Sequence, residues 1–296
     1  MRIISLLPSA TEILFALGLG EDVVGVTFEC DHPAEARDRR IVSTSALPEG
    51  LTPAEIDAVV KERIEAGEDL YRLAEGAFAE IDPTLVVTQD LCAVCAVDVS
   101  EVDQALEHLA CRADVLTLDP HTLDEVIDSI DTTGRATGTS ERAAELTAAL
   151  RGRVSALRAT LADVRRRSVV VLEWTEPAFT AGHWVPDLVE TGGGTCLLGV
   201  AGGHSVGIEW DAVAATDAEV VLVSPCGYRL DGAAALAAEV IDRGVLPPEA
   251  EVWAIDADHY MVRPGPRIVD GAETIATILH PDIAGAPDPT RARRLR

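Results

Sequence analysis

Four cysteines follow predicted strands, and together they could bind a metal. Cys92 and Cys95 form a CxxC pair, whose spacing lets two sulfurs reach one ion. Cys30 and Cys226 each follow another short apolar run that is typical of a buried strand. Four thiolates can hold Zn²⁺ tetrahedrally or a [4Fe–4S] cluster. The sequence therefore predicts a metal centre at these four residues, with a redox pair or four buried thiols as the alternatives.

Imidazole and flat aromatic side chains recur beside predicted strand ends and glycine turns. An imidazole is a common ligand of transition metals, and aromatic rings suit a large planar ligand such as a corrin or a porphyrin. Lid or lobe-interface packing of the aromatic rings, and capping or hydrogen bonding by the histidines, are the alternatives. We predict a ligand-binding surface made of His121, Trp174, His183, Trp184, His204, Tyr228, His259 and Tyr260.

Alternating strands and helices are expected to position these residues. Two series of strand-like apolar runs alternate with helical patterns, a pattern typical of parallel sheets that are covered by helices. Such sheets bind ligands beyond the carboxyl ends of their strands. The predicted fold class is α/β, with two Rossmann-like lobes of parallel sheet and a ligand cleft between the lobes. The runs span residues 3–7, 23–27, 85–88, 115–118, 168–172, 220–223 and 252–255.

One long amphipathic pattern separates the two series of strands. Between Thr139 and Arg167, apolar residues recur every three or four positions, which is the period of one helix face. The pattern predicts a spine helix that joins two lobes, and a crossover helix within one sheet is the alternative. The predicted regions are an N-terminal lobe over residues 1–138, the spine helix over 139–167, a C-terminal lobe over 168–283 and a loose tail over 284–296.

Two predicted helix starts carry the residue pattern of a capping box, in which a hydroxyl side chain and a glutamate three positions later bond to each other's backbone N–H groups. The first pair is Ser9 with Glu12, and the second is Thr122 with Glu125.

Composition excludes some partners. The formal net charge of the 296-residue chain is −26, which argues against a nucleic-acid partner because phosphates repel such a surface. No apolar run is long enough to span a membrane, so no membrane insertion is expected. The apolar run Ile3–Leu7 is also too short for the core of a signal peptide. These features predict a cytoplasmic location, or a periplasmic or extracellular one if a leader has been removed.

Familiar catalytic motifs are missing from the sequence. It contains no Walker P-loop, no GxGxxG after the first predicted strand, no GxSxG and no HExxH. The carboxylates are too numerous for any pair to stand out, and no catalytic residue is assigned. A non-catalytic binding protein is therefore favoured over an enzyme.

Three segments resemble one family of binding proteins. RIISLLPSATEILFALGLGEDVVG at Arg2–Gly25 resembles the opening of the cobalamin and iron-chelate binding proteins of ABC importers, the class III, helical-backbone solute-binding proteins. TAGHWVPDLVETGG at Thr180–Gly193 resembles their second-lobe helix, and RPGPRIVDGAETI at Arg263–Ile275 resembles their last helix. The resemblance implies two lobes bridged by one helix, a corrinoid or iron-chelate ligand (siderophore or haem), and an ABC permease as partner.

Three functions follow from these observations. The leading hypothesis is a cytosolic binding protein of this type whose cleft holds an iron–sulfur cluster or Zn²⁺ on the four cysteines. The second is a corrinoid, haem or siderophore binding component of an ABC import system. The third is a cluster- or thiol-dependent enzyme that acts in the same cleft.

Overall fold

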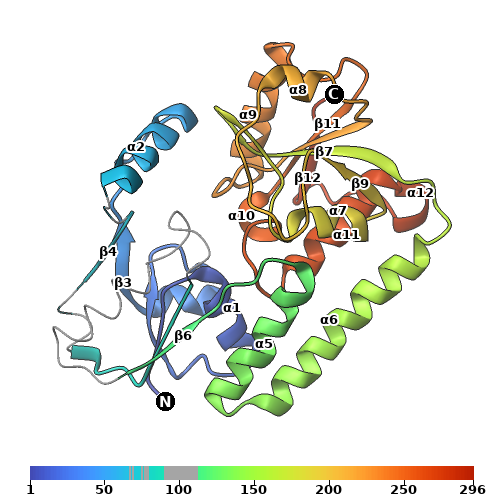
Figure 1. The fold of residues 1–296 in the computed structure, drawn as a ribbon. Coiled ribbons are helices and arrows are strands. Elements are labelled where there is room, and N and C mark those ends of the chain that lie inside the picture. The colour runs from blue at the N-terminus through green and yellow to red at the C-terminus, as the bar shows by residue number, and fades with distance from the viewer. Residues whose placement is uncertain (67, 69, 75, 77–79, 90–112) are drawn as a thin grey trace. The chain divides into compact units, whose positions relative to one another are not determined.

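The chain folds into two compact units in the computed structural model, which describes residues 1–296 except 67, 69, 75, 77–79 and 90–112 (Figure 1). The first unit comprises Met1–Pro120 and Ile127–Thr147, and the second comprises His121–Val126 and Ala148–Arg296. Each unit is built around one sheet.

The described residues of the first unit form a sheet of six strands in the order β4-β3-β2-β1-β5-β6. The central strands are parallel: Ile3 pairs with Val23 on one side and with Leu85 on the other. The edge strand β4 runs antiparallel to its neighbour β3. The strands are β1 (Ile3–Ser5), β2 (Val23–Thr27), β3 (Arg40–Ser45), β4 (Tyr71–Leu73), β5 (Leu85–Thr88) and β6 (Asp114–Thr117).

Helices α1 (Pro8–Ala16), α2 (Pro53–Ala66) and most of α5 (Leu123–Thr137) belong to the first unit, with the 3-10 helix η1 (Ala34–Asp38). The capping box predicted at Ser9 and Glu12 is wrong. Leu7 is the N-cap of α1 and Pro8 is its first residue, so Ser9 already lies inside the helix. Proline favours the first helical position because its φ angle suits a helix and it lacks an N–H to satisfy.

The sheet of the second unit has the order β12-β11-β10-β7-β8, and β9 also pairs with β7. Strands β7, β9, β10 and β11 are parallel, whereas the edge strands β8 and β12 are antiparallel to their neighbours. The strands are β7 (Arg167–Thr175), β8 (Ala178–Thr180), β9 (Gly194–Leu197), β10 (Val220–Val223), β11 (Glu251–Ile255) and β12 (Ala292–Arg294).

The core of the second unit lies between its central strands and α9 (Leu230–Asp242). Val221 and Val223 of β10 are fully buried and belong to one apolar cluster with Ala233 and Ala237 of α9. Burying a side chain of valine size stabilises the fold by roughly 1.5–3 kcal/mol. The other helices are α7 (Val185–Thr191), α8 (Trp210–Ala214), α10 (Ala257–Tyr260), α11 (Ile268–Leu279) and α12 (Pro281–Ala284).

The predicted spine helix is α6 (Ser140–Thr160), which ends seven residues before the predicted boundary at Arg167. Its buried face is as predicted and includes Ala143, Leu150 and Val154. Two arginines that follow the helix form ion pairs: Arg165 pairs with Glu219, and Arg167 pairs with Glu251. These ion pairs hold the arginines at the start of the second sheet.

The tail over 284–296 is not loose, and that prediction is wrong. It contains β12, in which Arg294 pairs with Trp253 of β11. The guanidinium of Arg296 donates to the carbonyl groups of Ala250 and Pro247. Arginine-rich composition suggested disorder, but the same side chains have carbonyl and carboxylate partners along the edge of the sheet.

The predicted α/β class with two sheets is confirmed, and the sheets are mixed rather than wholly parallel. Among the helices formed by the described residues, none combines the length and apolar character needed to cross a bilayer.

Candidate functional site

The cysteines predicted as metal ligands are only partly described. Cys92 and Cys95 lie outside the described residues. Cys30 is buried, and its sulfur lies 3.0 Å from the hydroxyl oxygen of Thr11, whereas Cys226 is exposed. The metal centre therefore stays a prediction.

The predicted ligand-binding residues all belong to the second unit, and some of them gather where its strands end. Because β7, β10 and β11 are parallel, the loops that follow them lie at one edge of the sheet. The rings of Trp174 and Tyr228 lie 5.8 Å apart, edge to face, and those of His259 and Tyr260 lie 6.0 Å apart. We call these four residues the strand-end edge.

Backbone hydrogen bonds fasten the loops of the strand-end edge together. The N–H of Cys226 donates to the carbonyl of Glu173, and the N–H of Asp258 donates to the carbonyl of Tyr228. Asp256 caps α10 by accepting from the N–H of His259. The edge is thus a set of three connected loops rather than three independent ones.

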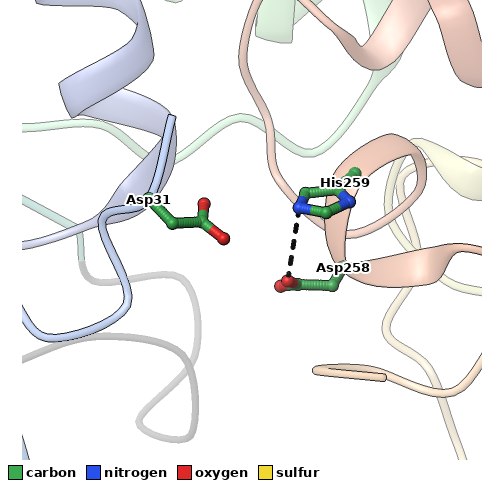
Figure 2. Close-up of side chains that lie close together, drawn as sticks. All are labelled: Asp31, Asp258 and His259. Carbon is green, nitrogen blue, oxygen red and sulfur yellow. Dashed lines mark ion pairs between the residues drawn. The ribbon is translucent and has the colours of Figure 1, made fainter. Parts of the chain in front are cut away.

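His259 has acidic partners on both ring nitrogens. Its Nδ1 lies 2.9 Å from the carboxylate of Asp256, and its Nε2 lies 3.9 Å from that of Asp258. Figure 2 shows the ring beside the Asp258 carboxylate on α10. Asp258 also pairs with Arg263 at 2.8 Å. These contacts explain the orientation of the His259 ring without a ligand.

Three other histidines of the predicted set form a cluster. The ring centroids of His183 and His204 are 5.3 Å apart, those of His121 and His183 are 5.8 Å apart, and those of His121 and His204 are 6.1 Å apart. We call His121, His183 and His204 the histidine cluster. The sequence predicted its members one by one, and the structure brings the three together from separate segments.

The backbone around Gly182 holds His183 and His204 close together. The N–H of His183 donates to the carbonyl of Gly203, and the N–H of Gly202 donates to the carbonyl of His183. A Cβ atom on Gly182 would lie 2.1 Å from the nitrogen of Ser205 and 2.6 Å from the carbonyl carbon of His204. Only glycine permits this approach. His183 itself has a φ of 48°, in the left-handed region.

His183 differs from His259 at its Nε2 atom. This atom is buried and has no hydrogen-bond partner among the residues that the structure describes. Burial lowers the pKa of the His183 imidazole, and the neighbouring rings of His204 and His121 lower it further. His183 is therefore favoured in its neutral form, which is the form that binds a metal ion.

His121 is held by the second capping box, which the structure confirms. The hydroxyl of Thr122 accepts from the N–H of Glu125, and the Glu125 carboxylate accepts from the N–H groups of Thr122 and His121. The bond from the His121 N–H lowers the pKa of the Glu125 carboxyl. A negative charge is thus kept beside the histidine cluster.

Trp184 is a packing residue of this region. It is 6% exposed, and its indole N–H donates to the carbonyl of Met261 at 2.7 Å. Its ring lies 5.7 Å from that of His183. The structure therefore favours the packing alternative for Trp184, whose ring lies next to that of His183.

The loop that contains His204 also has apolar residues that were not predicted as part of the site. It exposes three apolar side chains, Leu198 (40% exposed), Val200 (71%) and Val206 (54%), and it contains His204. Large exposed apolar side chains that gather in one segment are typical of a ligand or partner surface. The glycines at 199, 202 and 203 were the available signal for an irregular loop here.

Comparison with known proteins identifies the class. The model of the periplasmic binding protein family matches residues 3–243, and this chain belongs to that family. A curated relative, the "uncharacterized ABC transporter substrate-binding lipoprotein YvrC" of Bacillus subtilis (strain 168), is 27% identical over 293 residues. The match covers 95% of this chain and 80% of the relative.

Solved structures share the fold. The apo form of the periplasmic heme-binding protein RhuT from Roseiflexus sp. RS-1 superposes with a TM-score of 0.68 at 21% identity, over 96% of this chain and 98% of that one. The periplasmic vitamin B12 binding protein BtuF of Vibrio cholerae superposes with a TM-score of 0.62 at 22% identity, over 96% and 97%. At these identities the likeness concerns the fold.

Proposed function

We propose that this chain is the solute-binding component of an ABC import system and that it binds a metal-bearing organic ligand, which is haem, a corrinoid or an iron chelate. Membership of the periplasmic binding protein family supports the binding role. Proteins of the same fold support the ligand class, because they include a heme-binding protein and a vitamin B12 binding protein. The curated relative supports the ABC permease as partner.

The single observation that carries the ligand class is the state of His183. A neutral imidazole with a buried, unpartnered Nε2 is a ready axial ligand for haem iron or for a metal with an open position. Leaving such an atom unsatisfied costs free energy, on the order of 1–3 kcal/mol. Binding a metal through that nitrogen would recover this cost.

The surroundings of His183 suit the organic part of such a ligand. Val200 and Val206 offer exposed apolar surface on the loop that contains His204. Trp174 and Tyr228 add flat rings at the strand-end edge, and both are half-buried. Ligand pockets generally combine apolar walls with a few placed polar groups. His121, His204 and Tyr260 complete the proposed ligand-contacting set, and His259 is left out because carboxylates already lie near both of its ring nitrogens.

Absorption titrations of the full chain with ferric haem and with aquocobalamin test this proposal. We expect one equivalent of at least one of them to bind, with a shift of its visible bands. His183→Asn is the informative variant, because asparagine tolerates the left-handed backbone at this position. Trp210→Phe is the control. The Trp210 ring is half-buried and lies beneath the Arg243 guanidinium, and its substitution should leave ligand binding unchanged.

Two outcomes would contradict the proposal. The first is the absence of a spectral change at tens of micromolar with both ligands and with a ferric siderophore. The second is binding that is unchanged in His183→Asn. Growth of a deletion strain on haem or a ferric siderophore as sole iron source, with a loss restored by the intact gene, would test the import role.

The four-cysteine centre is a second candidate for this chain. Cys30 follows β2 and Cys226 follows β10, as predicted, and thiolate sulfur is a ligand of both Zn²⁺ and iron–sulfur clusters. Zn²⁺ or a [4Fe–4S] cluster on Cys30, Cys92, Cys95 and Cys226 would give either a metalloprotein of cytosolic location or a cluster-dependent enzyme. Metal and sulfide analysis of anaerobically purified protein tests it. A metal-free, colourless protein with four titratable thiols would contradict it.

The location of the protein is tested separately. A cytoplasmic location was predicted from the sequence, whereas the family and the curated relative favour the cell envelope. Fractionation of cells that express a C-terminally tagged chain from its own gene would distinguish the two.

A further inference from the structure

The histidine cluster has the dimensions of a metal site made of three imidazoles. Its ring centroids are separated by 5.3, 5.8 and 6.1 Å. Three imidazoles on one tetrahedral ion, with metal–nitrogen bonds of about 2.0 Å, place their ring centroids about 5 Å apart. The rings therefore need to approach one another by only about 1 Å to share an ion.

The nitrogens of the cluster require a rotation before they can converge. Within the described residues, the three rings do not yet place one nitrogen each within 4.8 Å of the others. The His204 ring is edge-on to both of the others, at 78° to His121 and 84° to His183. Because His204 is exposed, its ring can turn about the Cβ–Cγ bond without displacing the core.

The backbone of the cluster is already held in place. Two backbone hydrogen bonds join His183 to Gly202 and Gly203, and the capping box holds the segment of His121. A site whose ligands are positioned before binding loses less conformational entropy when the ion enters. The buried, unpartnered Nε2 of His183 is the atom that such an ion would satisfy.

We propose that His121, His183 and His204 bind one divalent transition-metal cation of the Zn²⁺, Co²⁺ or Ni²⁺ class directly, without an organic ligand. Imidazole nitrogen is a preferred ligand of these ions, and hard cations such as Mg²⁺ and Ca²⁺ prefer oxygen. Three protein ligands leave a tetrahedral ion one open position. That position is available to water or to a donor atom of a bound solute.

The Glu125 carboxylate contributes to the electrostatics of this site. It accepts from the N–H of His121 and thereby places a negative charge next to one of the three ligands. An anion near a cluster that receives a divalent cation favours binding, although partial exposure to solvent limits the effect. His121 side-chain substitutions leave this backbone bond in place, so they test the ring alone.

Titration of chelator-treated full-chain protein with Co²⁺ and Zn²⁺ tests the proposal. Calorimetry should give one equivalent of tight binding, and Co²⁺ should show visible bands of tetrahedral coordination. His183→Asn and His204→Gln should each weaken binding on the order of 100-fold or more, because a tetrahedral site would lose one of its ligands. His204→Gln should fold normally, because the side chain is exposed.

Two control variants make the result specific. His259→Gln should keep the full equivalent, because that ring is engaged with Asp256 and Asp258. Cys92→Ser/Cys95→Ser should also keep it, which separates the histidine cluster from a cysteine centre. Absence of binding in the wild-type protein up to 1 mM Zn²⁺ would overturn the proposal. Equal affinity in His183→Asn, His204→Gln and the wild-type protein would also overturn it.

This proposal and the proposed transport function can fail independently. Haem or corrinoid binding without Co²⁺ binding would overturn the cation site and leave the transport proposal in place. Co²⁺ binding without any binding of haem, corrinoid or siderophore would do the reverse.

Discussion

His183 and His259 belong to the same unit and both follow the same sequence signal, a histidine in a loop of an α/β sheet, yet their environments differ. His259 has carboxylates near both ring nitrogens, whereas the buried Nε2 of His183 has no hydrogen-bond partner within the described part of the chain. The pKa of His183 is lowered by burial and by two other histidines. The His259 ring is thus part of the fold's own polar network, and the His183 ring is suited to receive a ligand.

The largest effect is expected from a substitution at Gly182, which supports the backbone of His183 and not that of His259. Gly182→Ala places a Cβ against the backbone of His204 and Ser205, so the 204–205 segment must move. We expect a loss of about 3 kcal/mol in the free energy of unfolding, the upper part of the range for overpacking. Urea denaturation measures it, and haem and Co²⁺ binding should fall with it.

Gly152→Ala is the matched control for that substitution. Gly152 lies inside α6 with open space around it, so alanine should raise the free energy of unfolding by about 0.5–1 kcal/mol through helix propensity. If Gly182→Ala were as stable as the wild-type protein, the close approach at the histidine cluster would be contradicted.

The two histidines should respond to substitution in opposite ways. His183→Asn should weaken metal-ligand binding on the order of 100-fold with little change in stability. His259→Asn should lower the free energy of unfolding by about 1–3 kcal/mol, because it leaves the buried Asp256 carboxylate short of a partner. Binding titrations and urea denaturation on the same pair measure both. Loss of binding in His259→Asn alone would reverse the assignment.

Trp184→Phe tests the packing role of the ring behind His183. The change removes the indole N–H that donates to the carbonyl of Met261 and leaves that buried carbonyl without this donor. We expect a loss of about 1–2 kcal/mol in the free energy of unfolding. Affinity for haem or a corrinoid should change by less than about tenfold, or 1.4 kcal/mol. A larger loss of affinity would mean that Trp184 contacts the ligand.

The smallest expected effect is on the pH dependence of the free energy of unfolding. It limits the pH range in which His183 and His259 should be compared. Glu219 accepts from Arg165, which lowers the pKa of the Glu219 carboxyl to about 2. A carboxyl with a lowered pKa stabilises the folded state above its unfolded pKa of about 4.3, and this contribution is lost as the pH falls toward 2. We expect about 1 kcal/mol, because the pair is partly exposed.

Glu219→Gln provides the measurement for that carboxyl. Between pH 7 and pH 2 its free energy of unfolding should fall less steeply than that of the wild-type protein. Identical slopes would contradict the role of the Arg165–Glu219 pair. Binding experiments on the histidines belong above pH 5, where this contribution is complete.

Much of the architecture followed from local pattern. The apolar run at Val220–Val223 is the strand β10 as predicted, and the helical period around Val154 is the buried face of α6. The predictions failed where distant partners decide the outcome. β12 forms because β11 lies beside it, and the arginines at 165 and 167 pair with Glu219 and Glu251, which are distant in the sequence.

The candidate site was predictable by residue type and not by grouping. All three members of the histidine cluster were selected individually because loops beside strands carry ligands. Nothing in local sequence relates His121 to His204, since their proximity depends on the close approach at Gly182 and on the capping box at Thr122. The difference between His183 and His259 depends on burial and on the position of Asp256. Local sequence does not specify either of them.

The role of His183 is tested most directly by identifying the nitrogen that binds the metal. Pulsed electron paramagnetic resonance of the ferric haem complex, prepared with ¹⁵N-histidine-labelled protein, distinguishes protein imidazole from the haem nitrogens. We expect a ¹⁵N coupling in the wild-type protein and in His259→Asn, and its loss in His183→Asn. A haem complex without ¹⁵N coupling, or one whose coupling persists in His183→Asn, would show that His183 is not the ligand-binding histidine.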